Sequence, residues 1–300
     1  MTGHRAPAPA VDGLTSVVVV TADSGDGVGE CVERILRSTA PVEAIVVDNA
    51  SRDGSIERLT KRVGQDPRVR ILYNEKNLGF GAACNRGAAA AHGDAVMLLN
   101  PDCLIEVDTI ARLREILAAD ACIGVVGVMQ IDANGRVDPS SRRRDPLLRR
   151  ALASASGLAR WPRFAGVEMP PADGVAVVEA VDAVSGALML LPRSVFDRIG
   201  GFDEGYFLHC EDLDLCRRAR DAGWRAVCAR ELRVVHAKGG SSRHRPVFVA
   251  WHKHRSMWRW FTKFDPVARN SALRALVWCG IWAAFAARVP LLLLRRARML

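Results

Sequence analysis

The sequence predicts an α/β protein with a mostly parallel, doubly wound sheet and helices on both of its faces. Three observations point to this class. Aliphatic and β-branched runs recur along the first hundred residues, helical apolar repeats alternate with them, and a polar loop follows each run. With 300 residues, of which 49% are hydrophobic and 25% charged, the chain can bury one large core.

The first predicted strand covers residues 14–21. This β-branched run is bounded by Gly13 and by the turn-forming cluster at residues 23–25, as expected for a strand buried on both faces. A helix should follow, because apolar residues then recur at helical spacing. These residues are Val28, Val32, Ile35 and Leu36.

Two further units repeat this scheme, and a fourth strand completes it. "VEAIVVDNASRDGS" predicts a buried strand to Val47, a polar loop over residues 48–54 and a helix from Ser55. "VRILYNEKNLGFGAACNRGAAAA" predicts a third strand, a loop and a helix of small residues. The fourth strand, in "DAVMLLNPDCLI", stops at residues 100–102, because proline cannot continue a ladder of hydrogen bonds.

Polar residues stand just past the ends of these strands, on the edge where open α/β sheets bind ligands. They are Asp23, Asp48, Asn77 and Asp102. A hard divalent cation on Asp102 could bridge its carboxylate to a diphosphate. Asn-Pro-Asp also favours a plain turn, so this stretch by itself leaves both interpretations open.

A second group of polar residues lies far along the chain. In "LHCEDLDLCRRARDAGW" an apolar stripe predicts a helix that begins near Asp212, with Glu211 beside it in the first turn. Acids there stabilise a helix N-terminus, and they can also serve as a general base. His236 ends a later apolar run, where a structural role and a metal-ligand role are both open.

Seven stretches resemble glycosyltransferase family 2 in order and spacing, and most closely its bacterial rhamnosyltransferase branch. The resemblance covers residues 14–265. It implies a GT-A fold, which is a Rossmann-like sheet, a nucleotide-diphosphate sugar donor, a divalent metal (Mg²⁺ or Mn²⁺) and inversion at the anomeric carbon. The stretches are "SVVVVTADSG", "VVDNASRDGS", "NEKNLGFGAACNRG", "LLNPDCLI", "VSGALMLLPRSVFDRIGGFDEGYF", "EDLDLCRRARDAGW" and "VVHAKGGSS".

The resemblance assigns nucleotide-sugar binding to six residues. They are Thr21, Asp48, Asn77, Gly79, Asn85 and Asn100. In the family the aspartate at position 48 accepts a hydrogen bond from the pyrimidine ring, although a turn or cap role also suits it. Glycine lets the backbone approach a diphosphate, and free N–H groups at a helix start favour negative charge. Ala22 and Asp23 depart from the family's usual Tyr-Asn, so we expect no aromatic contact to the base.

The resemblance also implies a metal site and a catalytic pair. Asp102 matches the last acid of the family's Asp-x-Asp motif and His236 a metal ligand, whereas Asn100 replaces the first acid, which predicts modest metal affinity. Of the catalytic pair, Asp212 is the preferred base, with Glu211 as the alternate or as an orienting group.

The acceptor side is implied in the same way. Gly186 lies where relatives have their acceptor pocket, and residues 239–242 would close over the diphosphate.

Positive charge is concentrated near the C-terminus. Residues 243–300 hold twelve Lys or Arg, one acid and five of the seven Trp residues, whereas the whole chain has a net charge of +9. The apolar content of residues 272–294 would have no use on DNA, so an anionic membrane surface is favoured and nucleic acid is not expected. The uncharged stretch 275–287 is shorter than the ~20 residues that cross a bilayer, which favours a basic, shallowly inserted anchor over a spanning or buried helix.

Three regions are predicted: a disordered lead-in (1–13), a GT-A domain (14–265) and a membrane-associating helical tail (266–300). Within the domain, residues 14–130 form the nucleotide-sugar half and residues 180–265 the acceptor and catalytic half. Residues 132–180 predict an exposed excursion, either touching lipid phosphates or merely solvated. Eight cysteines without a CxxC pair, and no apolar segment near the N-terminus, predict a cytoplasmic protein on the inner face of the plasma membrane.

The predicted activity is an inverting, metal-dependent transfer of a sugar to a hydroxyl of a polyprenyl-diphosphate-linked saccharide. dTDP-rhamnose is the favoured donor, and cell-wall polysaccharide or O-antigen assembly the favoured setting. A UDP-hexose or other donor, and a noncatalytic nucleotide-sugar-binding protein, remain alternatives. A dehydrogenase is disfavoured because no GxGxxG follows the first strand.

Overall fold

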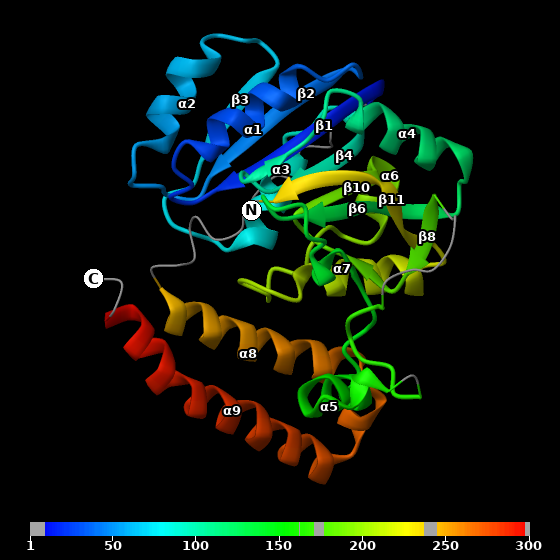
Figure 1. The fold of residues 1–300 in the computed structure, drawn as a ribbon. Coiled ribbons are helices and arrows are strands. Elements are labelled where there is room, and N and C mark those ends of the chain that lie inside the picture. The colour runs from blue at the N-terminus through cyan, green and yellow to red at the C-terminus, as the bar shows by residue number, and fades with distance from the viewer. Residues whose placement is uncertain (1–9, 162, 171–176, 237–244, 298–300) are drawn as a thin grey trace, which may run out of the picture.

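Figure 1 shows the fold in a computed structural model, which describes residues 10–161, 163–170, 177–236 and 245–297. Within these residues nine strands form one sheet, in the order β3-β2-β1-β4-β10-β6-β11-β5, and β8 pairs with β11. Pairing is parallel from β3 to β4 and between β6 and β11, and antiparallel elsewhere. The predicted mostly parallel α/β class is therefore confirmed. The strands are β1 (Val11–Thr21), β2 (Val42–Asp48), β3 (Val69–Tyr73), β4 (Gly93–Leu99), β5 (Cys103–Leu104), β6 (Ile123–Ile131), β8 (Val178–Val181), β10 (Leu188–Pro192) and β11 (Arg225–His236).

Helices cover both faces of the sheet because strand side chains alternate between two cores. Val17 and Val19 of β1 belong to one core, whereas Val18 and Val20 belong to the other. Each fully buried aliphatic side chain stabilises the fold by about 1.5–3 kcal/mol. The first core packs against α1 (Gly27–Leu36), α2 (Ser55–Val63) and α4 (Thr109–Ala119), and the second against α3 (Phe80–Ala89), α6 (Arg193–Arg198) and α7 (Glu211–Asp221).

The first strand begins earlier than the sequence predicted. Val11 already pairs with Gly93 of β4, and the Gly13 N–H donates to Asp94 Oδ2 at 3.1 Å. The prediction of disorder was therefore wrong for residues 11–13. The error is physical in origin, because long-range partners on β4 order a segment that has little apolar patterning of its own.

Residues 132–180 form structure that reaches the catalytic half of the domain. β7 (Arg142–Arg143) pairs antiparallel with β9 (Ala183–Val184) in a small second sheet. The other elements of this region are α5 (Leu148–Ser156) and two short 3-10 turns, η1 (Pro139–Ser141) and η2 (Leu158–Arg160). The prediction of a merely solvated or lipid-facing excursion was wrong for β7, because its pairing turns a side chain toward α7, as described below.

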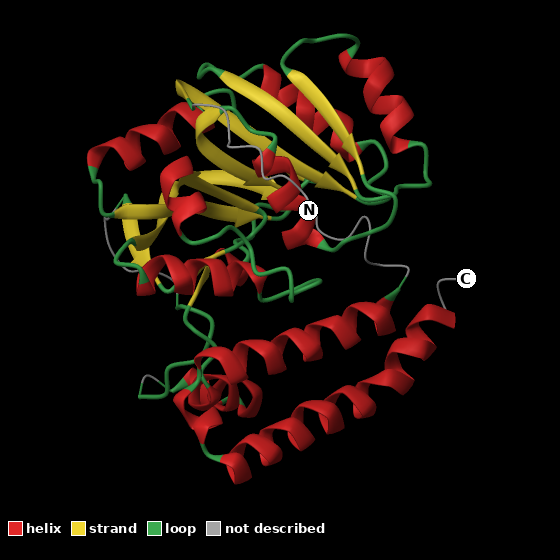
Figure 2. Ribbon diagram, turned by 180° about the vertical axis from the view of Figure 1, so that it is seen from behind, coloured by secondary structure: helices red, strands yellow, loops and turns green. Residues whose placement is uncertain are grey.

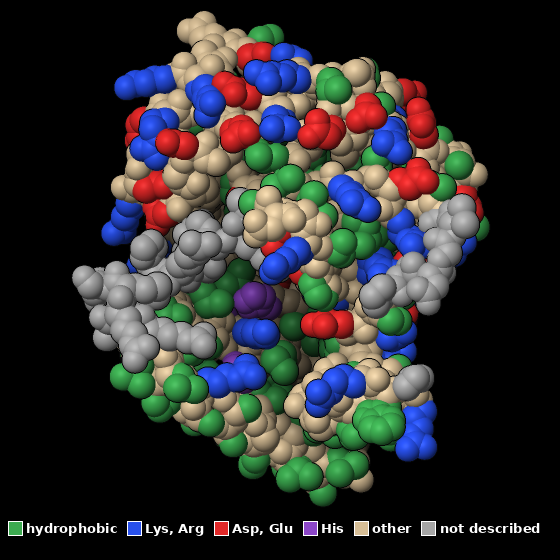
Figure 3. Space-filling view, viewed as in Figure 1, with side chains coloured by type: hydrophobic (Ala, Val, Ile, Leu, Met, Phe, Trp, Pro, Cys, Tyr) green, Lys and Arg blue, Asp and Glu red, His purple; other side chains and the backbone are tan. Residues whose placement is uncertain are grey.

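Two long helices follow the sheet domain and lie beneath it, side by side (Figure 2). They are α8 (Pro246–Phe264) and α9 (Ser271–Ala297), joined by the 3-10 turn η3 (Pro266–Arg269). The ring centroids of Trp251 on α8 and Trp282 on α9 are 4.6 Å apart. Figure 3 shows a hollow between this helix pair and the sheet domain, with a histidine and Lys or Arg side chains in it.

α9 is longer than the uncharged stretch suggested. Its segment Ser271–Leu294 has 24 residues, is apolar enough to cross a membrane, and is 0% buried over the window that meets this test. Helical structure continues past Arg288 and through Pro290. The length argument against a spanning helix, drawn from residues 275–287, therefore does not hold.

Candidate active site

The ends of β1 and β2 place Thr21 and Asp48 side by side, because the strands are parallel and these residues are partners in register. Both residues are buried. Asp48 Oδ1 accepts a hydrogen bond from the Ser51 N–H at 2.9 Å. The Thr21 hydroxyl has no partner among the described residues. A hydroxyl and a carboxylate are thus present at the edge where a nucleotide was expected.

The loop before α3 is held by Asn49. The Asn49 amide donates to Asn77 Oδ1 and to the Gly79 carbonyl, both at 3.1 Å. Gly79 has a φ of 87°, and a Cβ there would lie 2.5 Å from the Phe207 carbonyl oxygen, so a larger residue does not fit. The Phe80 N–H donates to that same carbonyl at 3.1 Å. This helix start therefore offers fewer free N–H groups to a diphosphate than the sequence suggested.

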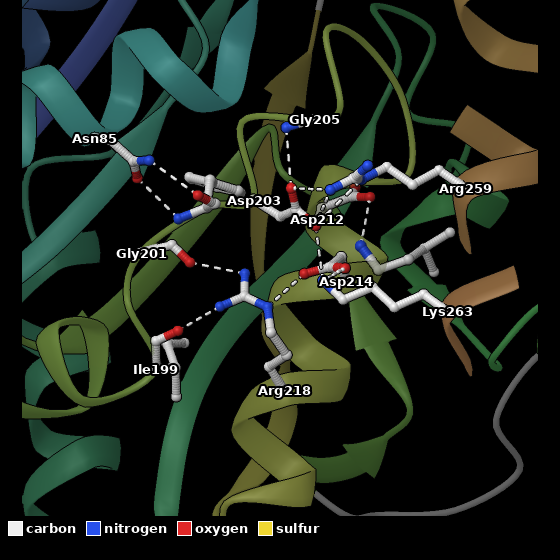
Figure 4. A network of polar contacts seen from close by, with 12 residues as sticks. Asn85, Ile199, Gly201, Asp203, Gly205, Asp212, Asp214, Arg218, Arg259 and Lys263 are labelled. Atoms are coloured by element: carbon white, nitrogen blue, oxygen red, sulfur yellow. Dashed lines mark hydrogen bonds and ion pairs between the residues drawn. The ribbon is translucent and has the colours of Figure 1, made fainter. Parts of the chain in front are cut away.

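Asn85 lies on α3, where its side chain holds a distant segment (Figure 4). Its Oδ1 accepts from the Phe202 N–H at 2.8 Å, and its Nδ2 donates to the Phe202 carbonyl at 2.9 Å and to Glu204 at 3.0 Å. Both ends of the amide are occupied, so the predicted nucleotide-sugar contact has no free group on this side chain. Sequence reasoning could not reveal this, because the partners lie more than a hundred residues away.

Strand pairing brings Asp102 and His236 together. β5 follows Asp102 directly and runs antiparallel to the end of β11, with Cys103 opposite His236. His236 Nε2 lies 3.2 Å from Asp102 Oδ1. Neighbouring ligands of an octahedral Mg²⁺, each about 2.1 Å from the ion, are about 3 Å apart, so these two atoms fit as a pair of ligands. Asn100 stands two residues before Asp102, after the end of β4.

The surroundings of this pair also suit a hard cation. Gln130 Oε1, at the end of β6, lies 3.0 Å from His236 Nδ1, which orients the ring and leaves Nε2 directed at Asp102. Cys103 completes a group whose ligand atoms all lie within 4.8 Å of one another. Burial, with the charge of Asp102, raises the pKa of the Cys103 thiol well above its usual range, and a thiol is a poor ligand for Mg²⁺ or Mn²⁺.

α7 begins with the two predicted catalytic acids, Glu211 and Asp212, and both are buried. Asp212 Oδ2 forms an ion pair with Arg143 and accepts from the Gly186 N–H at 2.9 Å. Its Oδ1 accepts from the Leu213 N–H at 2.8 Å. Glu211 Oε2 has no hydrogen-bond partner in the described part of the chain. One acid is therefore oriented and the other is left unpaired.

The two carboxyl groups differ in protonation. Burial, and then the negative charge of Asp212, raise the pKa of Glu211 to about 8. Burial also opposes ionisation of Asp212, but the charge and hydrogen bond of Arg143 and the backbone N–H groups outweigh it and lower the Asp212 pKa. At neutral pH the pair thus holds one ionised carboxylate, Asp212, beside a protonated Glu211.

The metal pair and the carboxylate pair lie at the same edge of the sheet. The Asn100 N–H donates at 2.9 Å to the Ala187 carbonyl, just before β10, and the adjoining Gly186 N–H donates to Asp212. A Cβ on Gly186 would lie 3.2 Å from Asp212 Cβ. Three segments far apart in the sequence therefore meet at this edge. A role for Gly186 in an acceptor pocket stays a prediction, and residues 239–242 lie outside the described residues.

Sequence reasoning missed Arg143 and Gln130. Arg143 stands in "SSRRRDPLLRR", where Arg142 instead pairs with Glu179 and Arg144 bonds the Glu168 carbonyl. Only the pairing of β7 with β9 decides which of the three faces Asp212. Gln130 is a buried polar residue in an otherwise apolar strand, a signal that could have marked it.

Together these features define a class of protein: an α/β enzyme with a hard-metal pair and a buried carboxylate pair at the carboxyl edge of its sheet. The fold matches that of a mannosyltransferase from Pyrobaculum calidifontis solved with GDP-Man and Mn²⁺, with a TM-score of 0.57 and 20% identity over 95% of this chain and 73% of that one.

Sequence comparison identifies the family. The model of Glycosyl transferase family 2 matches residues 16–168, half of the chain. An N-acetylglucosaminyl-diphospho-decaprenol L-rhamnosyltransferase of Mycobacterium tuberculosis is 32% identical over 249 residues, 75% of this chain and 78% of the relative. The rhamnosyltransferase WbbL of Escherichia coli K12 is 26% identical over 231 residues, 74% and 83% of the two chains. The chain therefore belongs to glycosyl transferase family 2 and is a glycosyltransferase.

Proposed function

We propose that this enzyme moves L-rhamnose from dTDP-rhamnose, with inversion, to a hydroxyl of a saccharide on a polyprenyl diphosphate in cell-surface polysaccharide assembly. Two relatives named as rhamnosyltransferases support the sugar, and one of them is named for a GlcNAc-diphosphate lipid acceptor. The observation that carries the proposal is the Asp102–His236 pair at the same sheet edge as the ionised Asp212.

In this proposal the ends of β1, β2 and β4 hold the donor. Thr21 and Asp48 contact the nucleoside, and the Asn100 amide contacts the ribose. When bound to Asp102 and His236, Mg²⁺ or Mn²⁺ would offset the negative charge that develops on the leaving nucleoside diphosphate.

Asp212 accepts the proton of the acceptor hydroxyl as that oxygen attacks the anomeric carbon. The new glycosidic bond forms while the bond from the anomeric carbon to the diphosphate breaks, and Asp212 keeps the proton. Its Oδ2 is held by Arg143 and Gly186, whereas Oδ1 accepts only from Leu213 among the described residues and keeps a lone pair for the hydroxyl. Glu211, protonated below about pH 8, suits an orienting hydrogen bond to a sugar oxygen.

We further propose that the enzyme acts at the cytoplasmic face of the plasma membrane, held there by α9. Exposed large apolar side chains along this helix support the proposal. They are Leu273, Leu276, Trp278, Leu291, Leu293 and Leu294. Such a helix suits insertion into a bilayer, and the basic residues around it suit anionic headgroups.

A donor panel tests the activity. Purified enzyme is incubated with Mn²⁺ or Mg²⁺, a GlcNAc-diphosphoryl lipid and dTDP-, UDP- or GDP-sugars, and products are identified by mass spectrometry. Product with dTDP-rhamnose, and none with the Asp212→Asn variant, is the expected result. Turnover restricted to another donor would contradict the rhamnosyl assignment, and donor binding without turnover would indicate a binding protein.

Liposome flotation tests the membrane assignment. The full-length enzyme should float with vesicles that contain anionic lipid, and a variant with Leu276→Asp and Leu291→Asp should stay in the dense fraction. The same double change on the α2 surface, at Lys61 and Arg62, is the matched control. Equal flotation of both variants, or retention on oligonucleotides at physiological salt, would contradict the proposal.

A further inference from the structure

The positive charges in the C-terminal half of α8 are paired. Figure 4 shows Arg259 and Lys263 reaching from α8 to Asp203, and Lys263 also reaching to Asp214 on α7. The closest distances are 2.7 Å for both contacts to Asp203 and 2.6 Å for the contact to Asp214. These ion pairs join α8 to the helix that carries the catalytic acids.

The positive charges in the N-terminal half of α8 are not paired. Lys253 and Arg255 are both exposed. Neither forms an ion pair or a hydrogen bond within the ranges of the chain that the structure describes. Two unneutralised cations therefore stand on this half of the helix, on either side of His254.

The turn before α7 packs against this same half of α8. The His252 ring is stacked on the Phe207 ring, with centroids 4.3 Å apart. The Ser256 hydroxyl donates to the Leu208 carbonyl at 2.9 Å. The turn and α8 are thus two walls that meet beneath the sheet domain, where Figure 3 shows the hollow.

Polar groups on both walls lack partners. His209 Nε2 and Glu211 Oε2 on the turn, and Nδ1 of His252 on α8, are buried without a hydrogen bond to the described residues. His252 is only 9% exposed. His209 and Cys210 also have left-handed φ angles of 68° and 65°. Unpaired buried groups and strained backbone both cost free energy, and they are typical of binding sites, where a ligand provides the missing partners.

The local charge favours an anionic ligand. Burial, and then the positive charge of Lys253, lower the pKa of His209 to about 4, and burial and the charge of Arg255 lower that of His252. Both imidazoles are therefore neutral at physiological pH, and each can donate one hydrogen bond to a phosphate or sugar oxygen. The hollow combines two free cations with neutral donors.

The order of these features matches the order of groups in a lipid-linked sugar. The catalytic acids lie on one side of the N-terminal half of α8, and α9 packs on the other, with His254 and Phe285 centroids 5.4 Å apart. In such a lipid the diphosphate likewise stands between the sugar and the apolar chain. We propose that the hollow between residues 207–211 and the N-terminal half of α8 binds the acceptor's diphosphate, with Lys253 and Arg255 contacting phosphate oxygens.

This inference rests on the proposed lipid-linked acceptor. A donor nucleotide is the other source of a diphosphate, and it is expected instead at Asp102 and His236. The two sources can be separated with soluble acceptors of two kinds. One is a short-chain alkyl GlcNAc diphosphate, and the other is the alkyl GlcNAc glycoside without the diphosphate.

Lys253→Met is the test variant, because Lys253 is exposed and its loss should not disturb folding. The KM for the diphosphate acceptor should rise about 10- to 100-fold, the range expected for one hydrogen bond to a charged group, with kcat nearly unchanged. Activity on the neutral glycoside and dTDP binding should stay as in the wild type. Lys253→Arg should restore most of the effect, and Lys61→Met on α2 is the control.

An equal loss on both acceptors, an unchanged KM, or a loss confined to nucleotide binding would overturn the inference. Binding of the alkyl GlcNAc diphosphate is also titrated without donor. If the wild type binds this compound and Lys253→Met does not, the site stands even when no donor sugar is transferred. Failure of the proposed function and failure of this site are thus distinguishable.

Discussion

The two edges of the central sheet use buried polar residues in opposite ways. At the amino-end edge, the Glu43 carboxylate accepts from the Ser16 hydroxyl and the His92 N–H, both at 2.6 Å, and pairs with Arg70 at 2.8 Å. At the carboxyl-end edge, Thr21 and Glu211 have buried oxygen atoms without a partner in the described ranges. Both edges carry polar residues, but only one leaves hydrogen-bonding capacity for a ligand.

This difference teaches that partner saturation, rather than polarity, separates a structural site from a functional one. A buried carboxylate with several donors stabilises the fold, whereas an unpaired one costs free energy. Asp212 lies between these extremes, because Oδ2 is held by Arg143 and Gly186 while Oδ1 has one backbone donor. Changes at the two edges should therefore have different effects, and four experiments compare them.

The largest effect is expected for Asp212→Asn, which removes the proposed base. The rate kcat should fall by about 10³-fold, within the range for general base catalysis, while donor affinity stays within about twofold. Steady-state kinetics with dTDP-rhamnose and calorimetry with dTDP measure the two quantities. A variant with near wild-type kcat would remove Asp212 from the reaction and leave Glu211 as the candidate.

Arg143→Gln should change the pH profile rather than abolish transfer. Without the guanidinium the pKa of Asp212 should rise by about 1–3 units, so the acidic limb of kcat/KM should move to higher pH by that amount. At neutral pH the loss should be about 10- to 100-fold, and it should diminish as the pH is raised. Arg144→Gln is the matched control from the same run of arginines. A uniform loss at every pH would argue against a charge effect on Asp212.

Gln130→Leu should weaken metal activation. Residues that orient a ligating histidine typically contribute 10–100-fold in metal affinity, so the Mn²⁺ concentration for half-maximal activity should rise by about that factor. The rate at saturating Mn²⁺ should be close to that of the wild type. An unchanged metal requirement would mean that the contact between Gln130 and His236 is structural only.

Glu43→Gln, at the opposite edge, should lower stability without changing the chemistry. The free energy of unfolding should fall by about 2–3 kcal/mol, because the variant loses charge-assisted hydrogen bonds. Transfer per folded molecule should stay unchanged. Urea unfolding monitored by tryptophan fluorescence gives the first quantity, and kinetics at low temperature the second.

The stability effect of Glu43 should depend on pH in a defined direction. Burial opposes its ionisation, but the hydrogen bonds from Ser16 and His92 and the charge of Arg70 outweigh burial and lower its pKa. Its stabilisation is therefore present above the pKa of the unfolded chain and is lost as the pH falls through the lower folded value. The difference between wild type and variant should shrink on acidification, and a difference that grows would contradict this assignment.

Much of the fold could be predicted from the sequence because its signals are local. The repeat of apolar strand, polar loop and amphipathic helix identified β1 to β4 and the helices between them, and helix α7 begins within one residue of its predicted start. Position relative to strand ends was also enough to propose Asp48, Asp102 and His236 for the ligand edge. These inferences needed only periodicity and the parallel direction of the strands.

The remaining features were decided by tertiary structure, because they depend on pairings between residues far apart in the chain. Arg143 reaches Asp212 only through the pairing of β7 with β9, and Asn85 is occupied by Phe202, to which no local signal points. The sequence by itself determined the fold class, the family and the kinds of group at the ligand edge. Which of those groups are saturated and which remain free was settled only when long-range hydrogen bonds and ion pairs formed.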